Sequence, residues 1–232
     1  MRKGFALLCA LCLLLGLAAC GGRGLTALDA AEHVQGLLDV TYLGVYDEGY
    51  LKSVGITQEQ AQADHESGLE VEYEYFTYCF DMNTDYLTGQ THDAIVALLA
   101  DIYQHSDYEV GTVTKQEDRF TIEVSIAPID IIPLVVERDM EAYSAAFADA
   151  YAHTDQAAVA AMSAVEQDAF WTAYENDWAM GVVELFRARL DELGHLEQVS
   201  VTVQFGPDEE GVYTISDKDF SAIDARILAY SY

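Results

Sequence analysis

Basic residues are scarce in this chain of 232 residues, which holds 11 Lys and Arg against 40 Asp and Glu. The formal net charge is therefore −29 at pH 7. A surface that binds nucleic acid needs clustered cations to neutralise phosphates, and electrostatic adhesion to anionic lipid needs them too. The shortage of basic residues thus excludes nucleic acid as an expected partner and excludes attachment to a membrane by charge.

The sequence also lacks the short motifs of the common catalytic and metal-binding classes. It has no Gly-x-Ser-x-Gly elbow for a serine nucleophile and no glycine-rich phosphate loop. Beyond residue 20 it has no His-Glu-x-x-His or Cys-x-x-Cys pair for zinc, and its six histidines are isolated from one another. No pair of carboxylates stands out among forty acids, so hydrolysis by paired carboxylates stays open as an alternative.

The first twenty residues carry the clearest pattern in the chain. Arg2 and Lys3 precede the apolar run Phe5–Ala19, and Leu17-Ala18-Ala19 ends that run with small residues directly before Cys20. The run is shorter than the roughly 20 residues that cross a bilayer. A basic start, an apolar stretch and small residues before a cleavage point indicate a signal peptide.

Leu-Ala-Ala-Cys at the end of such a run resembles the signal of bacterial lipoproteins. The resemblance implies that the Cys20 thiol receives a diacylglyceryl group and that a peptidase then removes residues 1–19. The net charge would become −31, because Arg2 and Lys3 leave with the peptide. Acyl chains would hold the protein at the extracytoplasmic face of the cell membrane, since each buried CH₂ contributes about 0.8 kcal/mol.

Residues 20–27 then form a lipidated tether that contains Gly21, Gly22 and Gly24. At about 3.5 Å per residue, residues 21–26 of this tether keep the folded part within roughly 20 Å of the bilayer. Cys79 is the one cysteine left for the folded part, so no disulfide can form within one molecule. Its aromatic neighbours Phe76 and Phe80 favour a buried, inert thiol.

Half of the residues are apolar, which is enough to bury a core. Apolar residues at helical spacing predict helices over 28–43, 58–80, 91–102, 137–152, 155–162, 163–193 and 218–228. Runs rich in Val, Ile and Thr predict two β-hairpins, over 109–126 and 198–216. The fold class is α+β, with two helix-rich halves, 28–134 and 135–232, each ending in an antiparallel hairpin.

The similar order of elements in the two halves suggests a weak internal repeat. It implies either two similar α+β lobes or one four-stranded antiparallel sheet with helices on one face, because the strands come in adjacent pairs. Capping boxes predict two of the helix starts, at Thr57-Gln58-Glu59-Gln60 and at Ser163-Ala164-Val165-Glu166. Thr91 is the expected cap of the helix between them.

One segment partly matches a calcium-binding loop. Asp81-x-Asn83-x-Asp85 reproduces the first three ligand positions of an EF-hand and joins two predicted helices. Tyr86 stands where that loop requires Gly, and His92 stands where it requires Glu. The other interpretation is that Asp and Asn simply favour turns. Calcium at Asp81, Asn83 and Asp85 is therefore a hypothesis, and no other cofactor is expected.

Two groups of aromatic residues are candidates for ligand binding. Trp171, Tyr174 and Trp178 recur at helical spacing, which is also typical of a buried helix face. The second group is Tyr42, Tyr46 and Tyr50. Loop glycines lie among these residues, which favours exposure of their rings to solvent. Exposed rings in an acidic setting suit sugars or cationic ligands.

Beyond its signal, the chain resembles the uncharacterised lipoproteins of Gram-positive bacteria in its helix–hairpin organisation. That resemblance implies a non-catalytic binding or envelope-associated role, with an envelope protein or a small ligand as the partner. The alternatives are a cell-wall hydrolase that uses carboxylates and a docking partner of a membrane protein.

Overall fold

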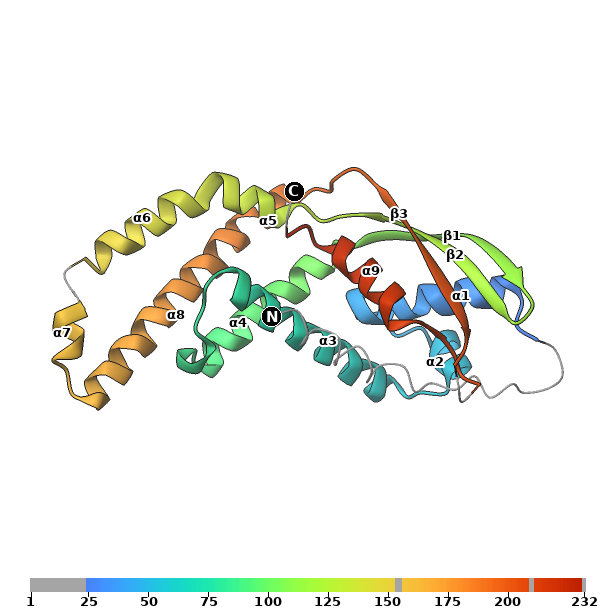
Figure 1. Cartoon of the computed structure of the whole chain (residues 1–232), viewed down its shortest axis with the longest axis horizontal. Coiled ribbons are helices and arrows are strands. Elements are labelled where there is room, and N and C mark those ends of the chain that lie inside the picture. The colour runs from blue at the N-terminus through green and yellow to red at the C-terminus, as the bar shows by residue number, and fades with distance from the viewer. Residues whose placement is uncertain (1–23, 153–155, 209–210, 231–232) are drawn as a thin grey trace. The chain divides into compact units, whose positions relative to one another are not determined.

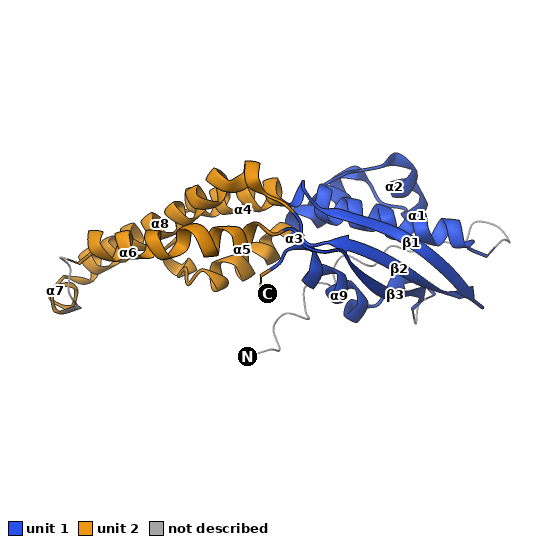
Figure 2. Cartoon of the chain, turned by 90° about the horizontal axis from the view of Figure 1, so that it is seen from above, with its two compact units in different colours: residues 1–68, 103–129, 195–229 blue, residues 69–102, 130–194, 230–232 orange. Residues whose placement is uncertain are grey.

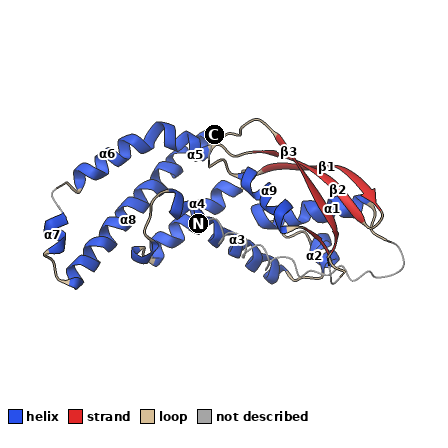
Figure 3. Ribbon diagram, viewed as in Figure 1, coloured by secondary structure: helices blue, strands red, loops and turns tan. Residues whose placement is uncertain are grey.

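The structure is a computed structural model that describes residues 24–152, 156–208 and 211–230. It confirms an α+β fold of helices and one antiparallel sheet (Figures 1 and 3). The helices are α1 (Ala27–Leu38), α2 (Glu48–Val54), α3 (Gln58–Cys79), α4 (Gly89–Tyr103), α5 (Ile131–Val135), α6 (Glu141–Ala150), α7 (Gln156–Ala160), α8 (Ala164–Arg189) and α9 (Asp217–Ile227), and the strands are β1 (Asp107–Gln116), β2 (Arg119–Ala127), β3 (Val199–Pro207) and β4 (Tyr213–Ile215).

Both predicted hairpins exist, and they join into one sheet of strand order β1-β2-β3-β4. The join is the antiparallel pairing of β2 with β3, in which Val124 lies opposite Val201 and Phe120 opposite Phe205. Of the two arrangements that the sequence allowed, the single four-stranded sheet is the one observed.

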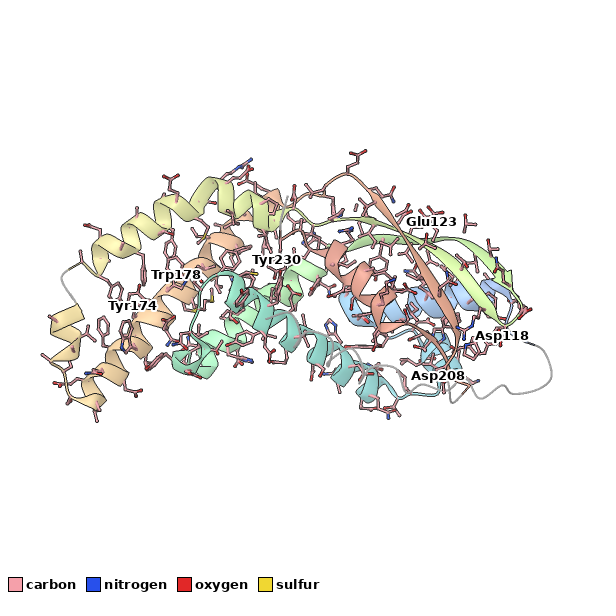
Figure 4. All side chains as sticks on the ribbon, viewed as in Figure 1. Asp118, Glu123, Tyr174, Trp178, Asp208 and Tyr230 are labelled. Atoms are coloured by element: carbon pink, nitrogen blue, oxygen red, sulfur yellow. The ribbon has the colours of Figure 1, made fainter. Side chains whose placement is uncertain are left out.

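The two faces of this sheet differ in composition because side chains alternate along each strand. One face is buried against α1 and α9 (Figure 1), and its β2 residues Phe120, Ile122, Val124 and Ile126 are fully buried. The other face carries Thr and Ser beside Glu123, whose side chain is exposed (Figure 4). The hydrophobic core of this part of the chain therefore lies between the sheet and the two helices.

Local signals set most of the helix starts. Both predicted capping boxes are present. In each, the hydroxyl oxygen of the first residue accepts a hydrogen bond from the backbone N–H of the fourth residue. The side chain of the fourth residue accepts a hydrogen bond from the backbone N–H of the first. The prediction that Thr91 caps α4 is wrong. The N–H of Thr91 instead donates to Oγ1 of Thr88, which places the start of α4 earlier.

Helix α2 was not predicted, since Gly49 lies inside it and Gly55 ends it in the left-handed conformation at φ 76°. Asp47 caps it by accepting a hydrogen bond of 2.8 Å from the Tyr50 backbone N–H. A helix this short shows too few turns for an apolar period to emerge from the sequence.

The chain divides into two compact units (Figure 2). Unit 1 comprises residues 1–68, 103–129 and 195–229 and contains the sheet, and unit 2 comprises residues 69–102, 130–194 and 230–232 and is helical. These interleaved units do not coincide with the sequential halves 28–134 and 135–232. Within the described residues, none of the helices is both long enough and apolar enough to span a bilayer.

Candidate functional site: an acidic groove in unit 1

An open groove of about 710 Å³ lies on unit 1, with walls from α1, from α2 and from Val110 of β1. Its acidic residues are Asp29, Glu32, Asp39 and Asp47, and we call it the acidic groove. Among the described residues that line it, none is Lys or Arg. Volumes of about 300–1,000 Å³ are typical of small-molecule sites.

Three of these carboxylates are held in place by hydrogen bonds. Asp29 forms a capping box with Thr26, and these bonds lower the pKa of the Asp29 carboxyl. Asp47 caps α2. Oδ1 of Asp39 accepts from Nε2 of Gln35 at 2.8 Å and from the Tyr108 hydroxyl at 2.9 Å. Fixed carboxylates form a binding surface without reorganising.

Two acceptors in the acidic groove remain available. The side chain of Glu32 is exposed and makes no hydrogen bond or ion pair with the described residues. Oδ2 of Asp39 likewise receives no hydrogen bond within the described part of the chain. Asp39 begins a π-helical turn, Asp39–Leu43, which interrupts regular helix geometry beside the groove.

His33 on α1 also lines the acidic groove, although its side chain is largely buried and its residue exposure is 7%. Its ring lies 5.7 Å from the Tyr50 ring and 4.8 Å from the Phe205 ring, measured between centroids. Burial lowers the pKa of His33 to about 4, so the imidazole is neutral at pH 7. Its Nδ1 atom is buried without a hydrogen-bond partner in the described residues. Such an unpaired atom costs about 1–3 kcal/mol.

Close packing joins α1 to α2 at the base of the acidic groove. A Cβ added at Gly36 would lie 2.3 Å from the Tyr50 ring, so only glycine allows this ring to approach the helix. Tyr50 itself is 8% exposed. The width of the groove therefore depends on a contact between Gly36 and Tyr50.

The predicted tyrosine group is divided by the fold. Only Tyr50 lines the acidic groove. Tyr42 is 2% exposed, its hydroxyl donates to Asp224 at 3.2 Å, and its ring contacts Tyr103, Tyr108 and Phe220. Tyr46 is half-buried, and its pKa is raised by burial. Tyr42 is thus a core residue of unit 1.

Trp171, Tyr174 and Trp178 lie on α8 in unit 2, where each is half-buried (Figure 4). The Trp178 ring lies 5.1 Å from both the Tyr143 ring and the Phe147 ring of α6, and its Nε1 donates to the Phe80 carbonyl at 2.8 Å. The Tyr174 and Trp178 rings pack between α6 and α8, so packing accounts for much of their surface. A ligand-binding role for them remains a prediction.

The calcium hypothesis gains no geometric support. Oδ1 of Asn83 accepts from the Asp85 backbone N–H, and the Asn83 N–H donates to Glu175 at 3.0 Å. Asp81 adopts the left-handed conformation at φ 53°. Among the residues that the structure covers, no three His, Cys, Asp or Glu side chains are grouped to hold a metal ion.

The predictions for Cys20 and Cys79 have different outcomes. Cys20 lies outside the described residues, so lipidation there stays a prediction. Cys79 is exposed rather than buried as its neighbours suggested. Desolvation nevertheless raises the pKa of its thiol, which disfavours the reactive thiolate.

The sequence contained one overlooked sign of the acidic groove. Asp29, Glu32, Gly36 and Asp39 are three or four residues apart, which places them on one side of α1. The same pattern is equally typical of the polar face of an amphipathic helix. Nothing local indicated that α2 would bring Asp47 and Tyr50 to the same place.

No protein-family model matches the chain, and no curated protein matches it. Its fold is similar to that of a solved structure from Bacillus subtilis, described as "a putative lipoprotein (ycdA)", with a TM-score of 0.55 and 12% sequence identity. The match covers 87% of this chain and 56% of the neighbour, so the chain spans little more than half of that protein. At this identity the likeness concerns the fold alone.

Proposed function

We propose that this chain is a lipid-anchored extracytoplasmic lipoprotein with a non-catalytic binding role. The observation that carries the proposal is the leader, in which basic Arg2 and Lys3, an apolar run and Leu17-Ala18-Ala19 precede Cys20. The fold neighbour described as a lipoprotein supports the same class of protein. The acyl chains on Cys20 hold the folded units at the outer face of the cell membrane.

The acidic groove supports binding over hydrolysis. A glycosidase needs a carboxyl group with a raised pKa beside a second carboxylate. In unit 1 the pKa is raised by burial for Asp64 and Asp224, and neither residue lines the groove. The pKa of Asp29, which does line it, is lowered. The two acids whose pKa is raised by burial thus lie outside the groove, whereas the charged form of Asp29 inside it is favoured.

The test of the anchor is to express the full chain in a Gram-positive host that is fed a palmitate analogue with a clickable group. The wild-type chain is expected to carry the label and to sediment with membranes, while Cys20→Ala loses the label and keeps the leader. Cys79→Ala is the matched control and is expected to behave as wild type. An unmodified Cys20 thiol in the native protein, found by mass spectrometry, would contradict the proposal.

A further inference from the structure

We propose that helices α6 and α8 of unit 2 dock a basic amphipathic helix of another protein. The apolar side chains of that helix lie on a row of aromatic rings, and its Lys or Arg side chains lie on the carboxylates beside the rings. This inference rests on the proposed binding role and names the chemistry of the partner. It comes from the exposure of the rings, the open surface of α6 and the charge around both.

The rings form a continuous row between α6 and α8, which are joined through α7 (Figure 1). The Phe147 ring lies 5.1 Å from the Trp178 ring and 4.9 Å from the Tyr174 ring. The Trp171 ring extends the row, 5.6 Å from Tyr174. We call the following residues the aromatic row, and each of them is half-buried: Tyr143, Phe147, Tyr151, Trp171, Tyr174 and Trp178. The row therefore keeps part of its ring surface accessible.

Helix α6 is covered much less than a helix of a packed domain. None of its residues is buried, and only Tyr143 and Phe147 are half-buried. The others are exposed, and most of them are apolar: Ala142, Ala145, Ala146, Ala148 and Ala150. Small side chains let another helix approach closely, and a third helix laid along the pair would complete a helical bundle.

Most polar groups of the aromatic row are already used within unit 2. The Tyr143 hydroxyl donates to the Asp177 carbonyl at 3.1 Å and to the Trp178 carbonyl at 2.9 Å. The Tyr151 hydroxyl donates to Oδ2 of Asp177 at 2.6 Å, and Nε1 of Trp178 donates to the Phe80 carbonyl at 2.8 Å. The row therefore offers a partner mainly ring surface, which binds apolar side chains and, through the negative ring faces, Lys or Arg.

The charge around the aromatic row favours a basic partner. The sequence has no Lys or Arg between Arg138 and Arg187. Exposed acids that form no ion pair with the described residues lie on both helices: Glu141, Asp149, Asp168 and Glu184. The complementary charge has to come from the partner. A second copy of α6 and α8 would instead bring acids against acids, and so would an anionic membrane.

The angles between the rings favour side chains over sugars. Tyr174 meets Phe147, Tyr151 and Trp171 at interplanar angles of 74°, 72° and 79°. Rings set edge to face form no flat platform on which a sugar could stack, whereas branched side chains can enter between them. Helix recognition by an apolar groove uses such side chains at positions i, i+3, i+4 and i+7.

Tryptophan fluorescence tests the proposal at its site. Trp171 and Trp178 are the two tryptophans of the chain, and both belong to the aromatic row. The probe is a labelled peptide of Leu and Lys, about 18 residues or five helical turns long, with leucines at helical spacing. It is titrated into the full chain in phosphatidylcholine nanodiscs, and binding to empty nanodiscs is subtracted. We expect saturable binding and a blue shift of the tryptophan emission.

Variants at the edge of the aromatic row measure the contribution of ring and charge. Trp171→Ala is expected to weaken binding about fivefold or more, as interface residues of consequence do, by the anisotropy of the labelled peptide. Asp177→Asn should weaken it about two- to fivefold, as one exposed ion pair does. Asn keeps an acceptor for the Tyr151 hydroxyl, so this variant should stay folded. Trp178→Phe leaves Trp171 as the reporter and should retain the blue shift.

Two matched controls remove similar groups elsewhere. Tyr78→Ala removes a ring of α3 that is 77% exposed, and Glu123→Gln removes an exposed acid of unit 1. Both are expected to bind the peptide as wild type. Equal weakening by Trp171→Ala and Tyr78→Ala would overturn the proposal. Equal binding of a scrambled peptide, binding without a change in tryptophan emission, or displacement by a neutral oligosaccharide of N-acetylglucosamine would overturn it too.

The same samples separate this inference from the proposed function. Mass spectrometry of Cys20 reports the lipid anchor, and the peptide titration reports the aromatic row. Absence of peptide binding with a lipidated Cys20 would sink the partner class alone. An unmodified Cys20 with intact peptide binding would sink the anchor and leave the docking site standing.

Discussion

The hydroxyl of Tyr108 on β1 donates a hydrogen bond of 2.9 Å to Oδ1 of Asp39, at the start of the π-helical turn after α1. The bond joins the edge strand of the sheet to the helix that carries most of the acidic groove. Burial and the nearby carboxylate raise the pKa of Tyr108, so this hydroxyl keeps its proton and remains a donor. The position of Asp39 in the groove thus depends on a residue far from it in the sequence.

Tyr108→Phe is expected to destabilise the protein by about 1 kcal/mol, the usual net contribution of a hydrogen bond. The loss is limited because Gln35 still donates to the same oxygen of Asp39. The change in the free energy of unfolding is measured by urea denaturation followed by circular dichroism. A variant as stable as wild type would mean that Tyr108 does not hold Asp39.

Gly36→Ala is expected to destabilise the protein by about 1–3 kcal/mol, the range for overpacking, because the new methyl group would lie 2.3 Å from the Tyr50 ring. Gly68→Ala in α3 is the matched control, since nothing lies within 4 Å of its added Cβ. That control should gain up to about 1 kcal/mol from helix propensity. Thermal denaturation of both variants gives the comparison. Equal effects would contradict the close contact between Gly36 and Tyr50.

His33 is expected to make the protein less stable as the pH falls. Its pKa is about 4 in the folded protein, whereas that of an unperturbed histidine is 6.5, so between these values the unfolded chain binds a proton that the folded protein does not. At 1.36 kcal/mol per unit, stability should fall by about 2 kcal/mol from pH 7 to pH 5 through this residue.

The comparison of wild type with His33→Phe isolates that contribution from the many acids that titrate nearby. Phe keeps a ring against Tyr50 and Phe205 and removes both nitrogens. The drop in unfolding free energy between pH 7 and pH 5 should be smaller in the variant. The same drop in both proteins would show that His33 titrates normally and is not buried as observed.

Trp178→Ala is expected to destabilise the protein by about 3 kcal/mol, because it removes a large packed ring and the hydrogen bond to the Phe80 carbonyl. Trp171→Ala should cost less, since its ring contacts only Phe170 and Tyr174 among the aromatic residues described. Melting temperatures separate the two. Small and equal losses would mean that this aromatic face is not needed for folding and would favour a role in binding.

Several elements could be predicted from the sequence because their causes lie within a few residues. The capping boxes at Thr57 and Ser163 and the apolar stripe of α4 (Ile95, Leu98, Leu99 and Ile102) act over one turn of helix, and all were found where expected. The run rich in Val, Ile and Thr over 119–126 likewise predicted a strand, and β2 is found there. The leader ending at Cys20 rests on a pattern of the same local kind, and it stays a prediction.

The acidic groove and the single sheet could not be predicted in this way, because they join residues far apart in the chain. Tyr42 and Tyr50 have similar sequence surroundings, yet Tyr42 is buried against Tyr103 and Phe220 while Tyr50 lines the groove. Neighbours in the sequence do not fix which side of a helix meets another element.

The sequence by itself determined the acidic character and the type and approximate limits of most helices and strands, since composition and short periods require no knowledge of distant contacts. Only the tertiary structure decided that β2 pairs with β3, that the units interleave, and that four carboxylates line one groove. Those results depend on which apolar faces pack together, and many sequences of similar local pattern could pack in other ways.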